Sequence, residues 1–361
     1  MEAYVVSYAR CFRPRLHGQL AHCQQYAKGL FHACRSNVER MNERLPDSSY
    51  DALHHFISES TWDRQLVMDE VARRMQATLA EVAGEEDEQG LLLDECGWEK
   101  AGHKSVGVGR QYIGQVGKIS NGQVGVFAVL SRGTSADLVG GQLYLPATWC
   151  TDAARCVRAR VPAAARAYRS KPKLAAVLVD HVLGQGLVRA DWVGGDAAYG
   201  NSPALRQALQ ARAQAHMLDV GPRLHLYLTD PGPATAPGLV GPGSTPTPSP
   251  ATGHGPGPAG TGSPGAGRRL GVGGLPAGPQ GAAGAPDRTA AGLALGNRPR
   301  ARRSGAAPQA LHLLISREPD ATQVKYSLCY CPPGAPALRV GQALYRQVQR
   351  YWIKRVFQKA K

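Results

Sequence analysis

The spacing of apolar residues changes near residue 85, and the change separates a helical segment from an α/β segment. Between residues 12 and 84, apolar residues recur every three or four positions, as on one face of an amphipathic helix. This spacing predicts helices over residues 18–45, 50–60 and 60–79, with a break at Pro46. Residues 1–84 are therefore predicted to form a small all-α N-terminal domain.

Short apolar runs of strand length begin at Leu91 and alternate with helical periods up to residue 230. Strands are predicted over residues 91–94, 121–131, 136–146, 190–196 and 215–220, and helices over residues 171–186 and 203–214. Three strands followed by helix, strand, helix and strand are typical of a mixed sheet with helices on its faces. The sequence thus predicts the α/β class for residues 85–230.

Residues 231–309 have a different composition, in which glycine and proline dominate and no aromatic residue or lysine occurs. Such a segment buries too little apolar surface to offset its ordering entropy, so it is predicted to be disordered. Order is predicted to return with strands over residues 310–320 and 324–333. A basic helix from Leu344 to Lys361 follows, so residues 310–361 are expected to complete the α/β domain.

The charge of the chain restricts its possible partners. A formal net charge of +15 and a pI near 9.7 favour a polyanion, most often nucleic acid. The eight cysteines include no C-x-x-C pair, which argues against a zinc site or a disulfide framework and favours reduced thiols in the cytoplasm. No apolar run reaches the roughly 20 residues of a membrane span, and the first residues lack a signal core. A cytoplasmic protein without a membrane partner is expected.

Two carboxylates are predicted to stand where buried strands end. The run LLLDE brings Leu91–Leu93 to Asp94, and DWVGGDAAYG brings a second apolar run to Asp196. Carboxylates at two strand ends can share one divalent metal ion, because carboxylate oxygens are ligands that Mg²⁺ prefers. The alternative is that each Asp caps the turn or helix that follows it. The residues alone leave both interpretations open.

Basic residues near Asp94 are candidates for contact with a nucleic acid backbone. GQVGK at residues 114–118 fails the spacing of a phosphate-binding loop, since Tyr112 and Ile119 occupy required glycine and hydroxyl positions. A surface loop carrying Lys104, Arg110 and Lys118 is instead predicted to contact phosphates. The arginines of the N-terminal helices fit either a DNA-docking face or a solvated structural face.

Four stretches together resemble the DDE transposases of bacterial insertion sequences. They are LLLDECGWEKAGHKSVGVGRQY, QLYLP, DWVGGDAAYG and QRYWIKRVFQKAK. The resemblance implies an RNase H-like catalytic domain in which Asp94 and Asp196 are the first two catalytic carboxylates. The third is a glutamate in a signature of tyrosine, arginine, glutamate and lysine, and here Arg350 and Lys361 hold the arginine and lysine places. Gln347 stands in the tyrosine place and Lys354 in the glutamate place.

The resemblance also implies the chemistry and the partners. Family members cleave and transfer DNA strands with two Mg²⁺ or Mn²⁺ ions, so Asp94 and Asp196 are the expected metal ligands. Double-stranded DNA at transposon ends, target DNA and a second copy of the chain are the expected partners, in association with the nucleoid. Arg350 and Lys361 join Lys104, Arg110 and Lys118 as expected DNA-binding residues.

Departures from the family pattern predict impaired activity. Lys354 would replace an anionic metal ligand by a cation, which favours an alternative function, an inactive remnant that only binds DNA. The glycine- and proline-rich segment replaces the family's β-rich insertion, which suggests a local frame shift, and the chain is expected to be truncated at its C-terminus. Glu95 is predicted to face away from Asp94, which excludes an acid–base pair of the two. Trp98 and Trp192 are expected in the core.

Overall fold

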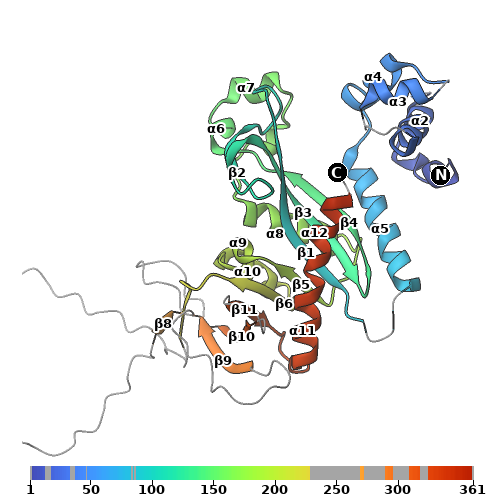
Figure 1. The fold of residues 1–361 in the computed structure, drawn as a ribbon. Helices are drawn as coiled ribbons and strands as arrows, with labels where there is room; N and C mark the ends of the chain where they lie inside the picture. Colours follow the sequence, from blue (N-terminus) through green and yellow to red (C-terminus); the bar gives the residue numbers. More distant parts are fainter. Residues whose placement is uncertain are drawn as a thin grey trace, which may run out of the picture. The chain divides into compact units, whose positions relative to one another are not determined.

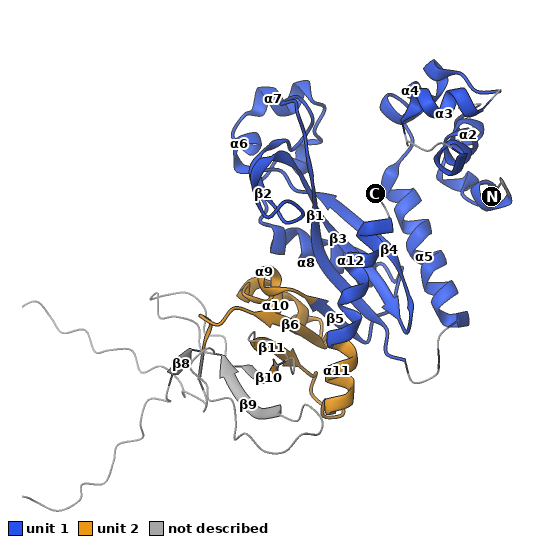
Figure 2. Ribbon diagram, in the orientation of Figure 1, with its two compact units in different colours: residues 1–194, 347–361 blue, residues 195–346 orange. Residues whose placement is uncertain are grey.

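The computed structural model describes residues 2–12, 18–32, 37–45, 47–82, 84, 87–227, 269–271, 289–295, 309–317 and 324–359 (Figure 1). The chain divides into two compact units (Figure 2). The first comprises Met1–Gly194 with Gln347–Lys361, and the second comprises Gly195–Arg346. The sequence-based limits at residues 84, 230 and 309 remain predictions. Within the described ranges, no helix is both long enough and apolar enough to cross a membrane.

The N-terminal part of the first unit is helical, as predicted. Its elements are α1 (Glu2–Val6), η1 (Ala9–Cys11), α2 (Gln19–His32), α3 (Val38–Arg44), α4 (Tyr50–Ser58) and α5 (Arg64–Val82). Aromatic rings form much of the core here, with Phe56 stacked on Trp62 at 5.8 Å between ring centroids and Phe12 within 6.3 Å of both. Burial of these large side chains accounts for helices that would be marginal alone.

One helix predicted in this region is wrong in its extent. The apolar spacing predicts a single helix over residues 18–45, but the structure has two helices in that range, α2 and α3. Asn37 begins the second of them as its N-cap, because its side-chain oxygen accepts a hydrogen bond from the Arg40 backbone N–H at 2.8 Å. A local capping side chain thus starts a new helix inside an apparently continuous pattern.

The strands of the first unit are organised around the long strand β3. They are β1 (Gly90–Glu99), β2 (Gly109–Ile113), β3 (Lys118–Arg132), β4 (Ser135–Leu143) and β5 (Trp192–Gly195). Strand β1 pairs antiparallel with one edge of β3, while β2 and β4 follow one another along its other edge. Strand β5 lies next to β1, where the ring of Trp192 packs against Gly90. The buried apolar run of β3 explains its central place.

Helices cover both faces of this sheet. The elements are α6 (Ala147–Cys150), α7 (Ala153–Arg158), η2 (Ala163–Ala165), α8 (Lys171–Gly184) and α12 (Tyr351–Lys359). Two adjacent glycines of β4 make room on opposite faces: Leu178 and Val182 of α8 lie over Gly140, and the ring of Phe127 lies over Gly141. Helix α12 contacts β1, β3 and β4 (Figure 1). The predicted α/β class is confirmed.

The second unit contains the remaining strands. Its elements are α9 (Ala197–Gly200), α10 (Pro203–Ala211), β6 (His216–Val220), β7 (His225–Tyr227), β8 (Arg269–Gly271), β9 (Thr289–Leu295), β10 (Gln309–Arg317), β11 (Val324–Tyr330) and most of α11 (Val340–Gln349). The strand order is β6–β11–β10–β9–β7–β8. Strands β8 and β9 fall within residues 231–309, where the sequence predicts disorder. The rest of that predicted disordered segment, up to residue 308, lies outside the described residues.

The C-terminal helical segment also differs from its prediction. A single helix is expected from Leu344 to Lys361, but α11 begins earlier, at Val340, and a turn at Arg350 separates it from α12. The predicted DNA contact Lys361 lies outside the described residues. Helix α12 is amphipathic, and its buried residues Ile353 and Val356 hold it on the sheet.

Candidate active site

Asp94 lies in the middle of β1, so the prediction that it ends the strand is wrong. The strand continues through Gly97, which pairs with Val124 instead of forming a turn, and ends at Glu99. The physical reason is the length of β3, whose backbone offers hydrogen-bond partners as far as Gly122. Burial does change at Asp94: Leu91–Leu93 are fully buried, whereas Asp94 is half-buried. The carboxylate therefore stands at the edge of the core, within a continuing strand.

Glu95 faces the opposite side of the sheet, as predicted. Lys171, the first residue of α8, donates a hydrogen bond from its Nζ atom to Oε1 of Glu95 at 2.6 Å. The same ammonium lies 5.8 Å from the ring centroid of Tyr144, a residue whose pKa is raised to about 12, chiefly by burial. Glu95 thus belongs to an ion pair on the face covered by α8, and it cannot act beside Asp94 on one bond.

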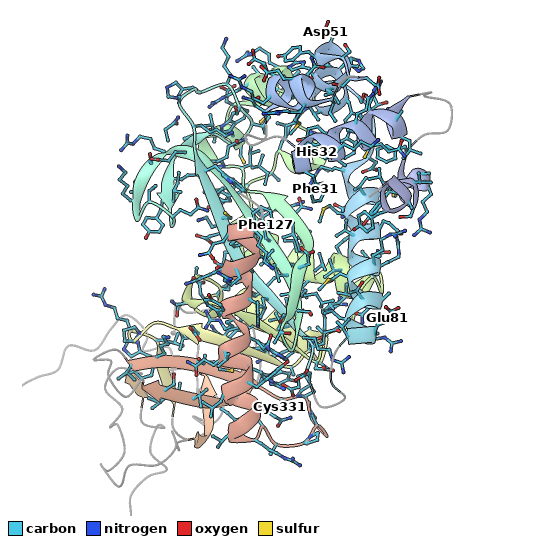
Figure 3. All side chains as sticks on the ribbon, turned by 45° about the vertical axis from the view of Figure 1, so that its right-hand side comes forward. Phe31, His32, Asp51, Glu81, Phe127 and Cys331 are labelled. Carbon is cyan, nitrogen blue, oxygen red and sulfur yellow. The ribbon has the colours of Figure 1, made fainter. Side chains whose placement is uncertain are left out.

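The face that carries Asp94 is the face covered by α12. Asp94 pairs with Phe127 across the β1–β3 ladder, so the two side chains share a face. Phe127, which is labelled in Figure 3, makes an edge-to-face contact with Phe357 of α12, at 5.4 Å between ring centroids. Lys354 precedes Phe357 by one helical turn and is exposed. The residue in the family's glutamate place is therefore carried by the helix on the Asp94 side of the sheet.

Asp196 directly follows β5, which ends at Gly195, so it stands at the end of this strand as predicted. It is the N-cap of α9, and its Oδ1 atom accepts a hydrogen bond from the Ala198 backbone N–H at 2.9 Å. The capping interpretation therefore describes a contact that Asp196 makes. Strand β5 lies next to β1 in the sheet, and Asp196 follows β5 in the chain as the second residue of the second unit.

The turn that begins at Asp196 is held by close backbone packing within the second unit. A Cβ atom at Gly200 would overlap the backbone carbonyl of Asp219 on β6, so only glycine fits there. The guanidinium of Arg206 donates a hydrogen bond to the Gly200 carbonyl. Tyr199 is fully buried and packs against Gly195, which supports a packing role for this tyrosine.

Arg206 is a site-supporting residue that the sequence does not reveal. Its side chain is buried, and burial lowers its pKa to about 10. It also helps burial to lower the pKa of the neighbouring His216 to about 4, so this histidine is neutral near pH 7. In the sequence, Arg206 is one of several polar residues on an amphipathic helix. Only the tertiary structure shows that it is buried, like Leu205 and Leu209 of the same helix.

The predicted DNA-binding residues lie on different kinds of structure. Lys104 is on an exposed loop, as predicted. Arg110 is in β2, paired with Asn121, and Lys118 is the first residue of β3, so the prediction that both lie on a loop is wrong. Regular cross-strand hydrogen bonds in the glycine-rich stretch form a hairpin there. Both side chains are exposed, whereas Arg350, at the turn before α12, is half-buried.

The donor atoms can be compared with what a divalent metal requires. Asp94 and Asp196 each offer carboxylate oxygens, which suit Mg²⁺ or Mn²⁺. Lys354 offers an ammonium, which repels a cation and cannot coordinate it. In the described part of the chain, no three His, Cys, Asp or Glu side chains are grouped as a metal site. Each aspartate by its own chemistry therefore suits a hard divalent ion, and Lys354 does not.

Comparison with known proteins identifies the family. The family model described as "DDE superfamily endonuclease" matches residues 11–263, which is more than half of the chain. The chain therefore belongs to the DDE superfamily endonucleases, which are generally dependent on divalent metals. The match extends past residue 231, where the family-like sequence was expected to stop.

The chain is also similar to a curated protein of known type. The chain is similar to the probable transposase for insertion sequence element IS701 of Microchaete diplosiphon. The two are 29% identical over 216 residues, which cover 55% of this chain and 51% of that protein. The chain thus spans about half the length of the curated relative.

Proposed function

We propose that this protein is an insertion-sequence transposase, an enzyme that cleaves DNA at transposon ends and joins the ends to target DNA. The family match and the similarity to a probable transposase support the proposal. The observation that carries it is the arrangement around β1. Asp94 shares a sheet face with the helix that carries the family's last signature.

The two aspartates are proposed to act together as metal ligands. Asp94 presents its carboxylate from a rigid, paired strand, and Asp196 presents its carboxylate from a capped turn supported by Arg206. When bound, Mg²⁺ or Mn²⁺ supplies Lewis-acid activation of the attacking hydroxyl and of the scissile phosphate. Each aspartate is held by its own element, so its carboxylate would need little local rearrangement to bind an ion.

The basic residues are proposed to hold the DNA. Lys104, Arg110 and Lys118 are exposed cations on the loop and hairpin that follow β1, where they can contact phosphates without sequence specificity. Arg350 and Lys361 are proposed to contact DNA from the C-terminal segment. Strand transfer uses two transposon ends, so we propose a homodimer assembled on DNA.

Lys354 favours a second candidate function, a catalytically inactive member that retains DNA binding. Two ions act in the family, and the family's third carboxylate is replaced here by an exposed ammonium. At about 4 Å and an effective dielectric constant near 20, each unit-charge repulsion costs about 4 kcal/mol, and exposure to solvent reduces this value. Weak binding of the second ion is the proposed consequence, and with it slow cleavage.

Metal-dependent nicking of transposon-end DNA tests the proposed function. The full-length protein is incubated with supercoiled plasmid carrying the element's ends, with Mg²⁺, with Mn²⁺ or with a chelator, beside Asp94→Asn. Nicking that requires the metal and disappears in Asp94→Asn is expected, because the amide keeps the shape of the side chain without its charge. Nicking that persists in Asp94→Asn contradicts the proposed active site. DNA binding without nicking by the natural protein supports the second candidate.

A further inference from the structure

The β2–β3 hairpin exposes two large apolar side chains side by side. Tyr112 and Ile119 occupy directly opposite positions on the two strands, so their side chains are neighbours on one face. Tyr112 is 54% exposed and Ile119 is 60% exposed. Single exposed apolar residues are common on protein surfaces, whereas these two adjacent side chains form one small apolar surface that a flat apolar partner can cover.

The segment that carries this pair is positively charged. Residues 100–121 contain no aspartate or glutamate, and they include four exposed cations: Lys100, Lys104, Arg110 and Lys118. Arg110 lies on the same face as Tyr112, two residues before it on β2. The preceding acid, Glu99, accepts a hydrogen bond from the Ser120 hydroxyl at 2.6 Å. The hairpin therefore presents an apolar pair with the cation Arg110 on the same face, and Lys118 at the start of β3 on the other face.

The hairpin is anchored, so the pair is held in a defined position. Ile113, on the other face, is buried against Gly97 and Val124. The side-chain amide of Gln111 donates a hydrogen bond to the Gly122 carbonyl at 2.6 Å, and that of Gln115 donates one to the Cys96 sulfur at 2.8 Å. A fixed aromatic side chain loses little conformational entropy when it binds a partner.

We propose that this hairpin binds unpaired bases of DNA, with Tyr112 stacked on a base, Ile119 packed beside it and Arg110 on a phosphate. The inference rests on the proposed function, because it takes DNA as the substrate. Unpaired bases expose the flat faces on which aromatic rings stack, whereas the bases of an intact duplex cover one another. Opening of base pairs at a cleaved end supplies such bases. A second copy of this chain fits less well, because two identical cationic faces repel each other.

Binding of the full-length protein to three labelled DNAs tests the inference: a single strand, a duplex with an unpaired end and a blunt duplex. Fluorescence anisotropy without divalent metal measures affinity and prevents cleavage. Tyr112→Ala is expected to weaken binding to the single strand and the unpaired end by about tenfold, the order expected for one base–aromatic stack, and to leave binding to the blunt duplex unchanged. Tyr112→Phe keeps the ring and is expected to bind normally.

A matched control variant distinguishes a stacking role of Tyr112 from the other possible outcomes. Tyr168 is similarly exposed, at 52%, and lies outside the hairpin, so Tyr168→Ala is expected to bind all three DNAs normally. Equal weakening on all three DNAs in Tyr112→Ala, or no weakening on any, overturns the stacking role while leaving the proposed function intact. Failure of the natural protein to bind any of the DNAs overturns the proposed function as well. Loss of self-association in Tyr112→Ala, with DNA binding unchanged, assigns the pair to a protein interface instead.

Discussion

Replacing Lys354 by glutamate is expected to increase metal-dependent nicking of transposon-end DNA by at least about tenfold, which corresponds to about 1.4 kcal/mol in the activation barrier. Lys354 is carried by α12, on the face of the sheet where Asp94 lies, and it occupies the family's glutamate place. The substitution removes a cation and adds an anionic ligand, so both changes favour binding of a second divalent ion. Nicking measured against Mg²⁺ or Mn²⁺ concentration is expected to show higher apparent metal affinity.

Lys359→Glu is the matched control for this prediction. Lys359 is exposed on the same helix and undergoes the same charge change, but it projects from a different side, five residues further on. Its substitution is expected to leave nicking near the level of the natural protein. Equal gains in both variants would mean that net charge, and not a metal ligand, controls the rate. Absence of any gain in Lys354→Glu would contradict the role assigned to position 354.

Replacing Gly200 by alanine is expected to destabilise the second unit by about 3 kcal/mol or more. The added Cβ would overlap the Asp219 carbonyl on β6, and backbone atoms cannot move away as the end of a flexible side chain can. The turn that starts at Asp196 would have to shift. Urea unfolding, combined with hydrogen exchange of the β6 amides, measures the loss in the unit concerned.

A glycine in open space provides the comparison. Gly341 lies in α11 of the same unit, and a Cβ atom there meets nothing within 4 Å. Gly341→Ala is expected to stabilise the protein by about 0.5–1 kcal/mol through helix propensity. Similar stabilities for Gly200→Ala and the natural protein would show that the backbone around Asp196 is looser than the structure indicates.

The sequence predicts the class of the fold and the order of its main elements, because apolar period is a local property. The period of three to four residues before residue 84 and the short apolar runs after Leu91 correspond to observed helices and strands. The extent of β1, in contrast, is not determined by local sequence. Its continuation past Asp94 depends on the length of its partner β3, and Gly97 therefore looks like a turn residue in isolation.

In the candidate site too, some residues can be predicted from local sequence and others only from tertiary structure. Asp94 and Asp196 are recognisable in the sequence because each follows an apolar run. Arg206 is not, since an arginine on an amphipathic helix usually faces solvent. Trp98 is predicted to be a core residue but is 40% exposed, because it lies near the end of β1, beyond the buried part of the strand. Trp192 is fully buried, as predicted. Tertiary packing determines whether Arg206, Trp98 and Trp192 are buried or exposed.

Calorimetric titration of Mn²⁺ into the full-length protein tests the central claim, that Asp94 and Asp196 share one metal ion. The natural protein, Asp94→Asn, Asp196→Asn and the double variant form a double-mutant cycle. If the aspartates share an ion, each single variant is expected to lose most of the Mn²⁺ affinity, and the double variant to lose little more. Additive losses, or Mn²⁺ binding that neither substitution changes, would contradict a shared site.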